Sequence, residues 1–221
     1  MNKLQGKKVI FLGDSITEGI GASSVDTCYV NVFKKISGAT VLNYGIGGTR
    51  IAPQEVIAKH GPEIWNDDFI KRAKRMEDNA DYVVVFGGTN DFAHGDAKLG
   101  KFKDTTDKTF YGALHVLFTY LYNKYPTSKI IMISPTHRQH ENRKRDEVGK
   151  RCKPLSRYVQ AIREECEKFS IPLLDLYKNS NFITDVECVK NLYLPDGLHP
   201  SDLGHEKIAK LLYSFIVSNY L

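Results

Sequence analysis

Five short apolar runs recur along the chain, and each pair is separated by a segment long enough to hold a helix. The runs have the length and composition of buried strands and cover residues 9–12, 40–44, 82–86, 129–134 and 171–174. Helical spacing of apolar residues is found at about 29–36, 68–77, 108–125, 154–169 and 202–218. Parallel strands need long crossovers, so this alternation predicts an α/β fold. We expect a three-layer α/β/α sandwich with about five parallel strands.

The chain of 221 residues is long enough for one sizeable core. No internal repeat or low-complexity linker divides it, so we expect a single domain over 1–221. The segment at about 136–153 is irregular and too long for an ordinary connection, and it carries seven Lys or Arg against three acidic residues after His137. We predict a basic, lid-like insertion there. It is either a solvated loop or a receptor for an anionic group such as an acidic sugar or a phosphate.

Composition excludes several classes of protein. A hydrophobic content of 42% and a charged content of 26% are ordinary for a globular domain, and no apolar run reaches the roughly 18 residues that span a bilayer. The net charge of +5 is modest, and no known nucleic-acid-binding module accompanies it. Residues 1–8 lead directly into the first predicted strand without a signal-peptide core. We therefore expect a cytoplasmic protein with no nucleic-acid partner and no membrane span.

The four cysteines are Cys28, Cys152, Cys166 and Cys188. They are widely scattered and form no C-x-x-C pair, so neither a zinc site nor a disulfide framework is predicted. We expect reduced thiols, mostly buried or half-buried.

A change from apolar residues to Gly, Asp and Ser follows the first predicted strand, in the stretch Gly13-Asp14-Ser15-Ile16. This composition is typical of a tight turn and a helix cap. In open α/β sheets, ligands bind at the carboxyl ends of the strands, which is where Ser15 would lie. Taken alone, Asp14 or Ser15 is more simply interpreted as the cap of the next helix.

Three other polar stretches follow strands or strand-like runs: residues 43–49, 87–91 and 194–200. Each has a plain structural alternative. The glycines after Tyr44 suit an ordinary βα turn, and as a dinucleotide fingerprint they fail because Arg50 occupies the third glycine position. Asn90 and Asp91 suit a cap or an Asx-turn, and an isolated His199 is more often structural.

Together these stretches contain the parts that acyl transfer requires. That reaction needs a nucleophile, a base, a group that orients the base, and donors aimed at the developing oxyanion. Ser15, His199 and Asp196 suit the first three roles, and Gly48 and Asn90 suit the last.

The same stretches resemble the sequence blocks of the SGNH hydrolases, also called GDSL-type esterases and lipases. Residues 13–16 resemble the first block, 87–91 the third, and 196–200 the fifth, D-x-x-H. The second block is looser, and counting five residues from Asn43 places its glycine at Gly48. The resemblance extends over 13–200 in the family's order. It implies a flavodoxin-like fold and a catalytic site that needs no cofactor and no metal.

The resemblance also implies a role for each residue of this site. Ser15 would be the nucleophile, His199 the base and Asp196 its orienting carboxylate. The oxyanion hole would consist of the Ser15 N–H, the Gly48 N–H and the side-chain amide of Asn90. Histidine titrates near neutrality, so it suits the transfer of the serine proton to the leaving alcohol. Asp14 would hold the turn that presents the serine.

Substrate-binding residues are predicted only from their position beside the blocks. They are Tyr44, Arg50, Phe92, His94, Tyr193 and Leu194. Each is also explained as an ordinary surface or packing residue. His137, His140 and Glu141 lack further ligands nearby in the sequence, so we do not predict a metal site from them.

The leading hypothesis is a serine esterase that releases a short acyl group, such as acetyl from a carbohydrate, through an acyl-enzyme. The alternatives are a lysophospholipase or thioesterase, and a non-catalytic ligand-binding relative. A nucleotide- or phosphate-binding protein is disfavoured because G-x-x-x-x-G-K-[ST] is absent. The expected partner is a small-molecule ester.

Overall fold

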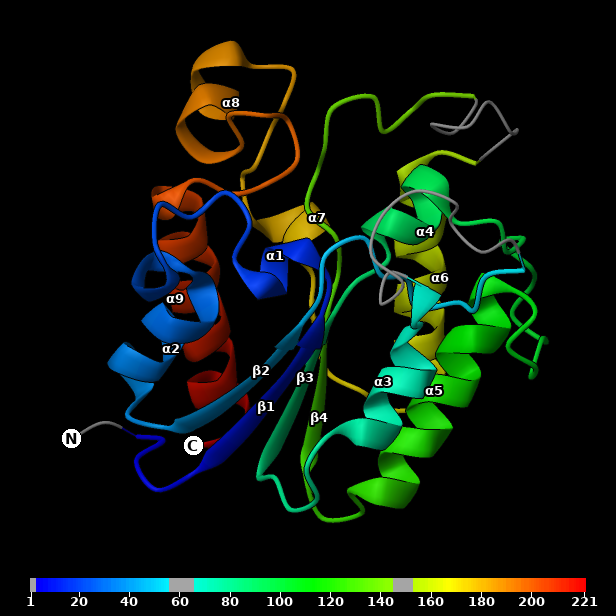
Figure 1. The fold of residues 1–221 in the computed structure, drawn as a ribbon, viewed down its shortest axis with the longest axis horizontal. Helices are drawn as coiled ribbons and strands as arrows, with labels where there is room; N and C mark the ends of the chain where they lie inside the picture. Colours follow the sequence, from blue (N-terminus) through cyan, green and yellow to red (C-terminus); the bar gives the residue numbers. More distant parts are fainter. Residues whose placement is uncertain (1–2, 56–65, 145–152) are drawn as a thin grey trace.

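The computed structural model describes residues 3–55, 66–144 and 153–221. Within them, one parallel sheet has the strand order β2-β1-β3-β4-β5. Helices cover both of its faces (Figure 1), so the three-layer α/β/α fold with five parallel strands is confirmed. The strands are β1 (Lys8–Gly13), β2 (Thr40–Gly45), β3 (Tyr82–Phe86), β4 (Lys129–Ile133) and β5 (Leu173–Leu174). Because every pair is parallel, the carboxyl ends of the strands meet along one edge.

Alternate strand residues build two hydrophobic clusters, one on each face of the sheet. Ile10 and Leu12 of β1 belong to one cluster, and Val9 and Phe11 belong to the other. Successive side chains of a strand point to opposite faces, so a continuous apolar run is what a strand covered on both sides requires. This explains why the strands appear in the sequence as unbroken apolar runs.

The long helices form the outer layers. On one face lie α2 (Tyr29–Ser37) and α9 (Asp202–Tyr220), and on the other lie α3 (Phe69–Arg75), α5 (Phe110–Lys124) and α6 (Leu155–Lys168) (Figure 1). All five correspond to predicted helical segments, with ends within two residues of the expected ones.

Polar caps set where several of these helices begin. Asp68 accepts the N–H of Lys71 at the start of α3, and Ser201 accepts the N–H of Gly204 at the start of α9. Pro154, the first residue of the predicted segment 154–169, lies at the N-cap of α6, one position before the first helical residue.

In the described part of the chain, five short helical elements were not predicted, because one or two turns carry too little periodicity to be recognised. They are α1 (Ser15–Glu18), the 3₁₀ turn η1 (Val25–Thr27), α4 (Thr89–His94), α7 (Leu176–Asn179) and α8 (Glu187–Tyr193). In Figure 1, α1 and α4 lie near the carboxyl edge of the sheet and α8 extends beyond it.

The predicted insertion at about 136–153 lies partly outside the described residues, which include 136–144 and 153. The described cysteines are free thiols: Cys28 and Cys166 are buried, and Cys188 is exposed. None of the helices in the described part of the chain is long and apolar enough to cross a bilayer.

Candidate active site

The sequence-predicted catalytic residues come together at the carboxyl edge of the sheet. Ser15 is the first residue of α1, directly after β1. The side chain of Asp14 caps this helix by accepting the N–H of Ile16 at 3.1 Å. The cap holds the tight turn between strand and helix. Ser15 therefore presents its hydroxyl at the sheet edge, and its own N–H belongs to the first turn, where helices lack internal acceptors.

His199 and Asp196 reach Ser15 from the loop before α9. The Ser15 Oγ lies 3.0 Å from the His199 Nε2, and the His199 Nδ1 lies 2.7 Å from the Asp196 Oδ2. A carboxylate only accepts hydrogen bonds, so the Nδ1 carries a proton and the Nε2 is left to accept the serine hydroxyl. Segments 184 residues apart in the sequence thus form one hydrogen-bonded chain.

The second oxygen of Asp196 fixes the loop itself. Its Oδ1 accepts the backbone N–H groups of Leu198 at 2.8 Å and His199 at 2.7 Å. Partial burial raises the pKa of Asp196, but the hydrogen bonds from the His199 side chain and from these two N–H groups outweigh it, and the net shift is downward. Asp196 is therefore held as a carboxylate, the form that orients an imidazole.

Gly48 and Asn90 follow β2 and β3, whose carboxyl ends lie on either side of the end of β1. Gly48 has a φ of 71°, a left-handed conformation that favours glycine, in the turn after β2. Asn90 is the second residue of α4, and its side-chain amide donates to the carbonyl of Thr49 at 3.0 Å. That bond uses one of the two amide hydrogens and leaves the other for a ligand.

Arg72 of α3 holds together several backbone segments at the carboxyl edge of the sheet. Its guanidinium donates to the Thr49 hydroxyl at 2.6 Å, to the Gly13 carbonyl at 2.9 Å and to the Tyr44 carbonyl. It therefore joins the ends of β1 and β2 to the residue that follows Gly48. Burial lowers the pKa of Arg72 to about 10, which leaves it charged at neutral pH. Nothing in the sequence of α3 distinguishes Arg72, so sequence reasoning missed it.

Asp91 supports the same edge from α4. Its carboxylate accepts the backbone N–H groups of Ile51 at 3.0 Å and Ala52 at 2.9 Å. Burial raises its pKa to about 6, although these hydrogen bonds and the charge of Arg50 act in the opposite direction. Asp91 lies in the third sequence block, and its contacts indicate a structural role.

Arg50 and His94, two of the six residues predicted to bind substrate, contact each other, and Arg50 also contacts the turn that carries Gly48. The Arg50 Nη1 lies 2.7 Å from the His94 Nδ1 and 3.3 Å from the Gly48 carbonyl. Arg50 is buried. It therefore supports the turn rather than extending from it.

The other four residues lie elsewhere. Phe92 and Leu194 are buried in the two hydrophobic clusters, so we leave them out of the proposed binding site. The Tyr44 hydroxyl accepts the backbone N–H of Glu77 at 3.0 Å, and the Tyr193 ring packs against Phe182. The position of these four residues beside the sequence blocks did not indicate which way their side chains point.

A polar pocket adjoins the loop that carries Asp196 and His199. Its volume is about 640 Å³, and it is lined by residues 137–143 and 183–185. Its wall contacts the loop where the Gln139 N–H donates to the Gly197 carbonyl at 2.7 Å. The His137 Nδ1 lies 2.9 Å from the Glu141 carboxylate, and this hydrogen bond raises the pKa of His137. In the described parts of the chain, no three His, Cys, Asp or Glu side chains gather as metal ligands.

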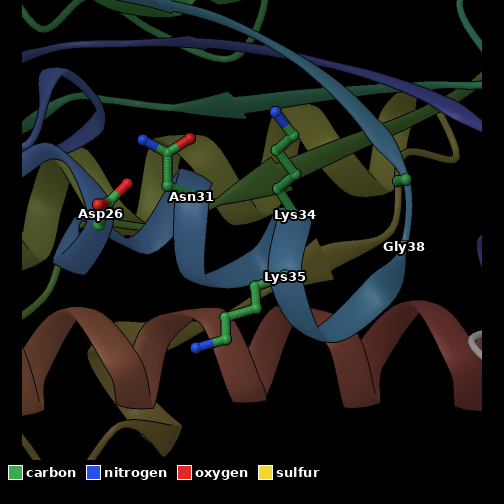
Figure 2. A pocket seen from close by; sticks show the side chains of 6 residues that line it. Asp26, Asn31, Lys34, Lys35 and Gly38 are labelled. Atoms are coloured by element: carbon green, nitrogen blue, oxygen red, sulfur yellow. The ribbon is translucent and has the colours of Figure 1, made fainter.

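A second pocket, of about 720 Å³, lies beside α2 (Figure 2). Lys34 and Lys35 line it, but Figure 2 shows their side chains pointing in different directions. They do not converge on a ligand, so we assign this pocket no role.

A family model described as the GDSL-like lipase/acylhydrolase family matches residues 11–207. The chain therefore belongs to this family of hydrolases, as the sequence blocks predicted. No curated protein sequence matches it.

Solved structures share the fold over nearly their whole length. A protein from Lactobacillus plantarum is 30% identical, with 99% of this chain and 100% of that chain covered and a TM-score of 0.81. A lipase/acylhydrolase from Enterococcus faecalis is 21% identical, with 96% of each chain covered and a TM-score of 0.64. An acetylxylan esterase from Geobacillus stearothermophilus is 21% identical, with 98% and 96% covered and a TM-score of 0.60.

Proposed function

We propose that this chain is a serine esterase that releases a short acyl group from an alcohol with several hydroxyl groups, such as a carbohydrate. The acyl group that we propose is acetyl. The observation that carries the proposal is the hydrogen-bonded chain from Ser15 through His199 to Asp196, with distances of 3.0 and 2.7 Å. Membership of an acylhydrolase family supports the reaction class.

In this reaction, the Ser15 Oγ attacks the ester carbonyl while the His199 Nε2 takes the hydroxyl proton. The carbonyl oxygen becomes an oxyanion, which the N–H groups of Ser15 and Gly48 and the Asn90 amide stabilise. His199 then gives its proton to the departing alkoxide, and Asp196 stabilises the imidazolium in between. Water, deprotonated by His199, hydrolyses the acyl-enzyme.

Two observations favour a polar alcohol. The pocket beside the catalytic loop is lined mainly by polar and charged side chains, which suit hydroxyl groups better than an alkyl chain. A structure with the same fold belongs to an acetylxylan esterase. We propose that the alcohol part of the substrate occupies this pocket, with 137–143 as one of its walls.

Replacement of Ser15 tests the reaction class. Ser15→Ala is expected to lower kcat for p-nitrophenyl acetate by about 10⁴- to 10⁶-fold, because nothing else supplies the attacking oxygen. A fluorophosphonate probe should label the parent chain and not this variant. Ser218→Ala, an exposed serine of α9, is the matched control and should retain both properties. Hydrolysis that survives Ser15→Ala would show that another group is the nucleophile, and a parent chain that hydrolyses no ester would leave the non-catalytic alternative.

Acyl-chain length separates the proposal from the lysophospholipase or thioesterase alternative. We expect kcat/KM for p-nitrophenyl esters to be highest at acetate or butyrate and to fall at octanoate and palmitate. Acetate release from acetylated sugars, compared with ethyl acetate, tests the alcohol. A clear optimum at long chains would favour the alternative.

A further inference from the structure

The turn that carries Gly48 is bonded at its centre to a side chain from α1. The Glu18 Oε2 accepts the backbone N–H of Gly47 at 2.7 Å. Gly47 directly precedes Gly48, whose N–H is one of the proposed oxyanion donors. A hydrogen bond from an N–H to a carboxylate is about twice as strong as one between neutral groups.

Glu18 and Ser15 are opposite ends of the same four-residue helix, α1. The backbone N–H of Glu18 donates to the Asp14 carbonyl at 2.9 Å, which fixes Glu18 relative to the turn that presents Ser15. The hydrogen bond from the Glu18 side chain to Gly47 therefore connects the helix that carries Ser15 directly to the turn that carries Gly48. Two of the three proposed oxyanion donors, the N–H groups of Ser15 and Gly48, lie at the two ends of this connection.

Other contacts bring α1 and the end of β2 together but stop short of the turn. The Asn43 amide donates to the Thr17 carbonyl at 2.8 Å, and the Asn43 Oδ1 accepts the Gly45 N–H at 2.8 Å. A Cβ on Gly45 would collide with the backbone of Glu18, so only glycine permits this approach. The Ile46 N–H donates to the carbonyl of Gly13, before α1, at 3.1 Å, and in the described structure the hydrogen bond from α1 itself to the turn is the one from Glu18 to Gly47.

The turn needs such a bond because of its composition. Gly47 and Gly48 are adjacent, and glycine has the largest backbone freedom of any residue. The Thr49 hydroxyl donates to the Ile46 carbonyl at 2.6 Å and closes the turn, and the Arg50 Nη1 lies 3.3 Å from the Gly48 carbonyl, but neither bond reaches the N–H group of Gly47 or Gly48. The Glu18 carboxylate holds the Gly47 N–H, and so limits the directions that the next N–H, that of Gly48, can take.

The charge of Glu18 cannot be what assists the reaction. Glu18 is exposed and makes no salt bridge with any residue that the structure describes. A carboxylate next to a developing oxyanion raises the energy of that oxyanion by Coulomb repulsion. What Glu18 offers the site is therefore the position of a hydrogen-bond acceptor.

We propose that Glu18 is a positioning residue for the oxyanion hole, holding the Gly47-Gly48 turn so that the Gly48 N–H and the Ser15 N–H point to the same place. The proposal rests on the esterase function proposed above. In this proposal the reaction depends on the position of the Glu18 acceptor oxygen and not on the negative charge of the carboxylate.

Two substitutions at this position test it. Glu18→Ala removes the acceptor and is expected to lower kcat for p-nitrophenyl acetate by about 10- to 100-fold, less than the 10²- to 10³-fold loss typical of a deleted oxyanion donor. KM should change less than twofold. Glu18→Gln keeps an acceptor oxygen and loses the charge, so it should restore kcat to within about threefold of the parent. Glu167→Ala, an exposed glutamate of α6, is the control and should match the parent.

A transition-state mimic provides a readout that a general loss of structure would not produce. Phenylboronic acid forms a tetrahedral anion on a nucleophilic serine, so its inhibition constant should rise in Glu18→Ala by the same factor as kcat falls. Fluorophosphonate labelling of Ser15 and the melting temperature should both be retained. The Ser15→Ala result is obtained first, so a failure of the esterase assignment is recognised separately from a failure at Glu18.

Three results would overturn the proposal. Parent-level kcat in Glu18→Ala would show that the turn needs no such bond. Equal losses in Glu18→Gln and Glu18→Ala would show that the charge is required. A raised KM with unchanged kcat would place Glu18 in contact with substrate instead.

Discussion

At the residue scale, the site depends on three carboxylates in two different environments. Asp196 is partly exposed, and its hydrogen bonds keep its pKa low, so it remains ionised beside His199. Asp14 and Asp91 are fully buried, and burial raises their pKa to about 7 and about 6. The first suits an orienting charge in catalysis. The other two hold backbone N–H groups and make the stability of the fold depend on pH.

Asp14 leads to a prediction about that pH dependence. Its folded-state pKa of about 7 lies above the unfolded value near 4, so between these pH values the folded state binds more protons than the unfolded state. The free energy of unfolding therefore falls as pH rises from about 4 to 7. Asp14→Asn retains a capping side chain and removes this ionisation. Its stability relative to the parent should be greater at pH 8 than at pH 5, by about 1 to 3 kcal/mol.

Urea unfolding of both proteins at the two pH values measures this difference. Asp26→Asn, at an exposed aspartate, is the matched control and should follow the parent at both pH values. Parallel pH curves for the parent and Asp14→Asn would contradict the prediction.

At the scale of elements, the proposed active site lies where short helices and turns meet the ends of strands. The one-turn helix α1 presents Ser15, α4 presents Asn90, and the turn after β2 presents Gly48. Such short segments have little stability of their own. They depend on bonds from neighbouring elements, and Arg72 of α3 supplies three of these at once.

Arg72 therefore carries the prediction for this scale. Arg72→Lys keeps a positive charge but lacks the planar guanidinium that reaches Gly13, Tyr44 and Thr49 together. Loss of buried hydrogen bonds to charged groups is expected to lower the free energy of unfolding by about 2 to 4 kcal/mol. Esterase activity should fall as well, because the Gly48 turn loses its anchor at Thr49.

The control lies on the same helix. Arg75 pairs with Asp67 on the surface, and its side chain is 57% exposed. Arg75→Lys should change the free energy of unfolding by less than about 0.5 kcal/mol, because exposed ion pairs contribute little. Equal urea midpoints for the two variants would contradict the role assigned to Arg72.

At the scale of the whole molecule, the C-terminal helix completes both the core and the site. The loop that carries Asp196 and His199 leads directly into α9, which packs on α2 and on the sheet. The buried ring of His205 in α9 accepts the Tyr29 N–H at 3.2 Å and lies 3.2 Å from the Ile20 carbonyl. Docking of α9 thus brings His199 to Ser15.

Two leucines of α9 provide the test at this scale. Leu212 is fully buried and Leu203 is 50% exposed. Leu212→Ala is expected to lower the free energy of unfolding by about 2 to 5 kcal/mol, because it leaves a cavity in the core. Leu203→Ala should change it by less than about 0.5 kcal/mol. Comparable urea midpoints for the two variants would show that α9 adds little to the core.

The sequence by itself determined the layers of this protein and the residues of its four motifs. Apolar runs such as 9–12 are local patterns, and a strand covered on both faces requires them wherever it lies in the fold. Gly13-Asp14-Ser15 is likewise a local pattern, because a capped turn after a strand is specified by adjacent residues. These features can be recognised without knowing any contact between distant segments.

Only the tertiary structure decided which side chains meet. Phe92 and His94 are two residues apart, yet Phe92 packs in the core and His94 contacts Arg50. The bonds of Glu18 to Gly47 and of Arg72 to Thr49 join residues 29 and 23 positions apart. Side-chain direction and long-range pairing are set by the packing of helices on the sheet, which no local pattern encodes. The residues that position the site therefore became visible only in the folded chain.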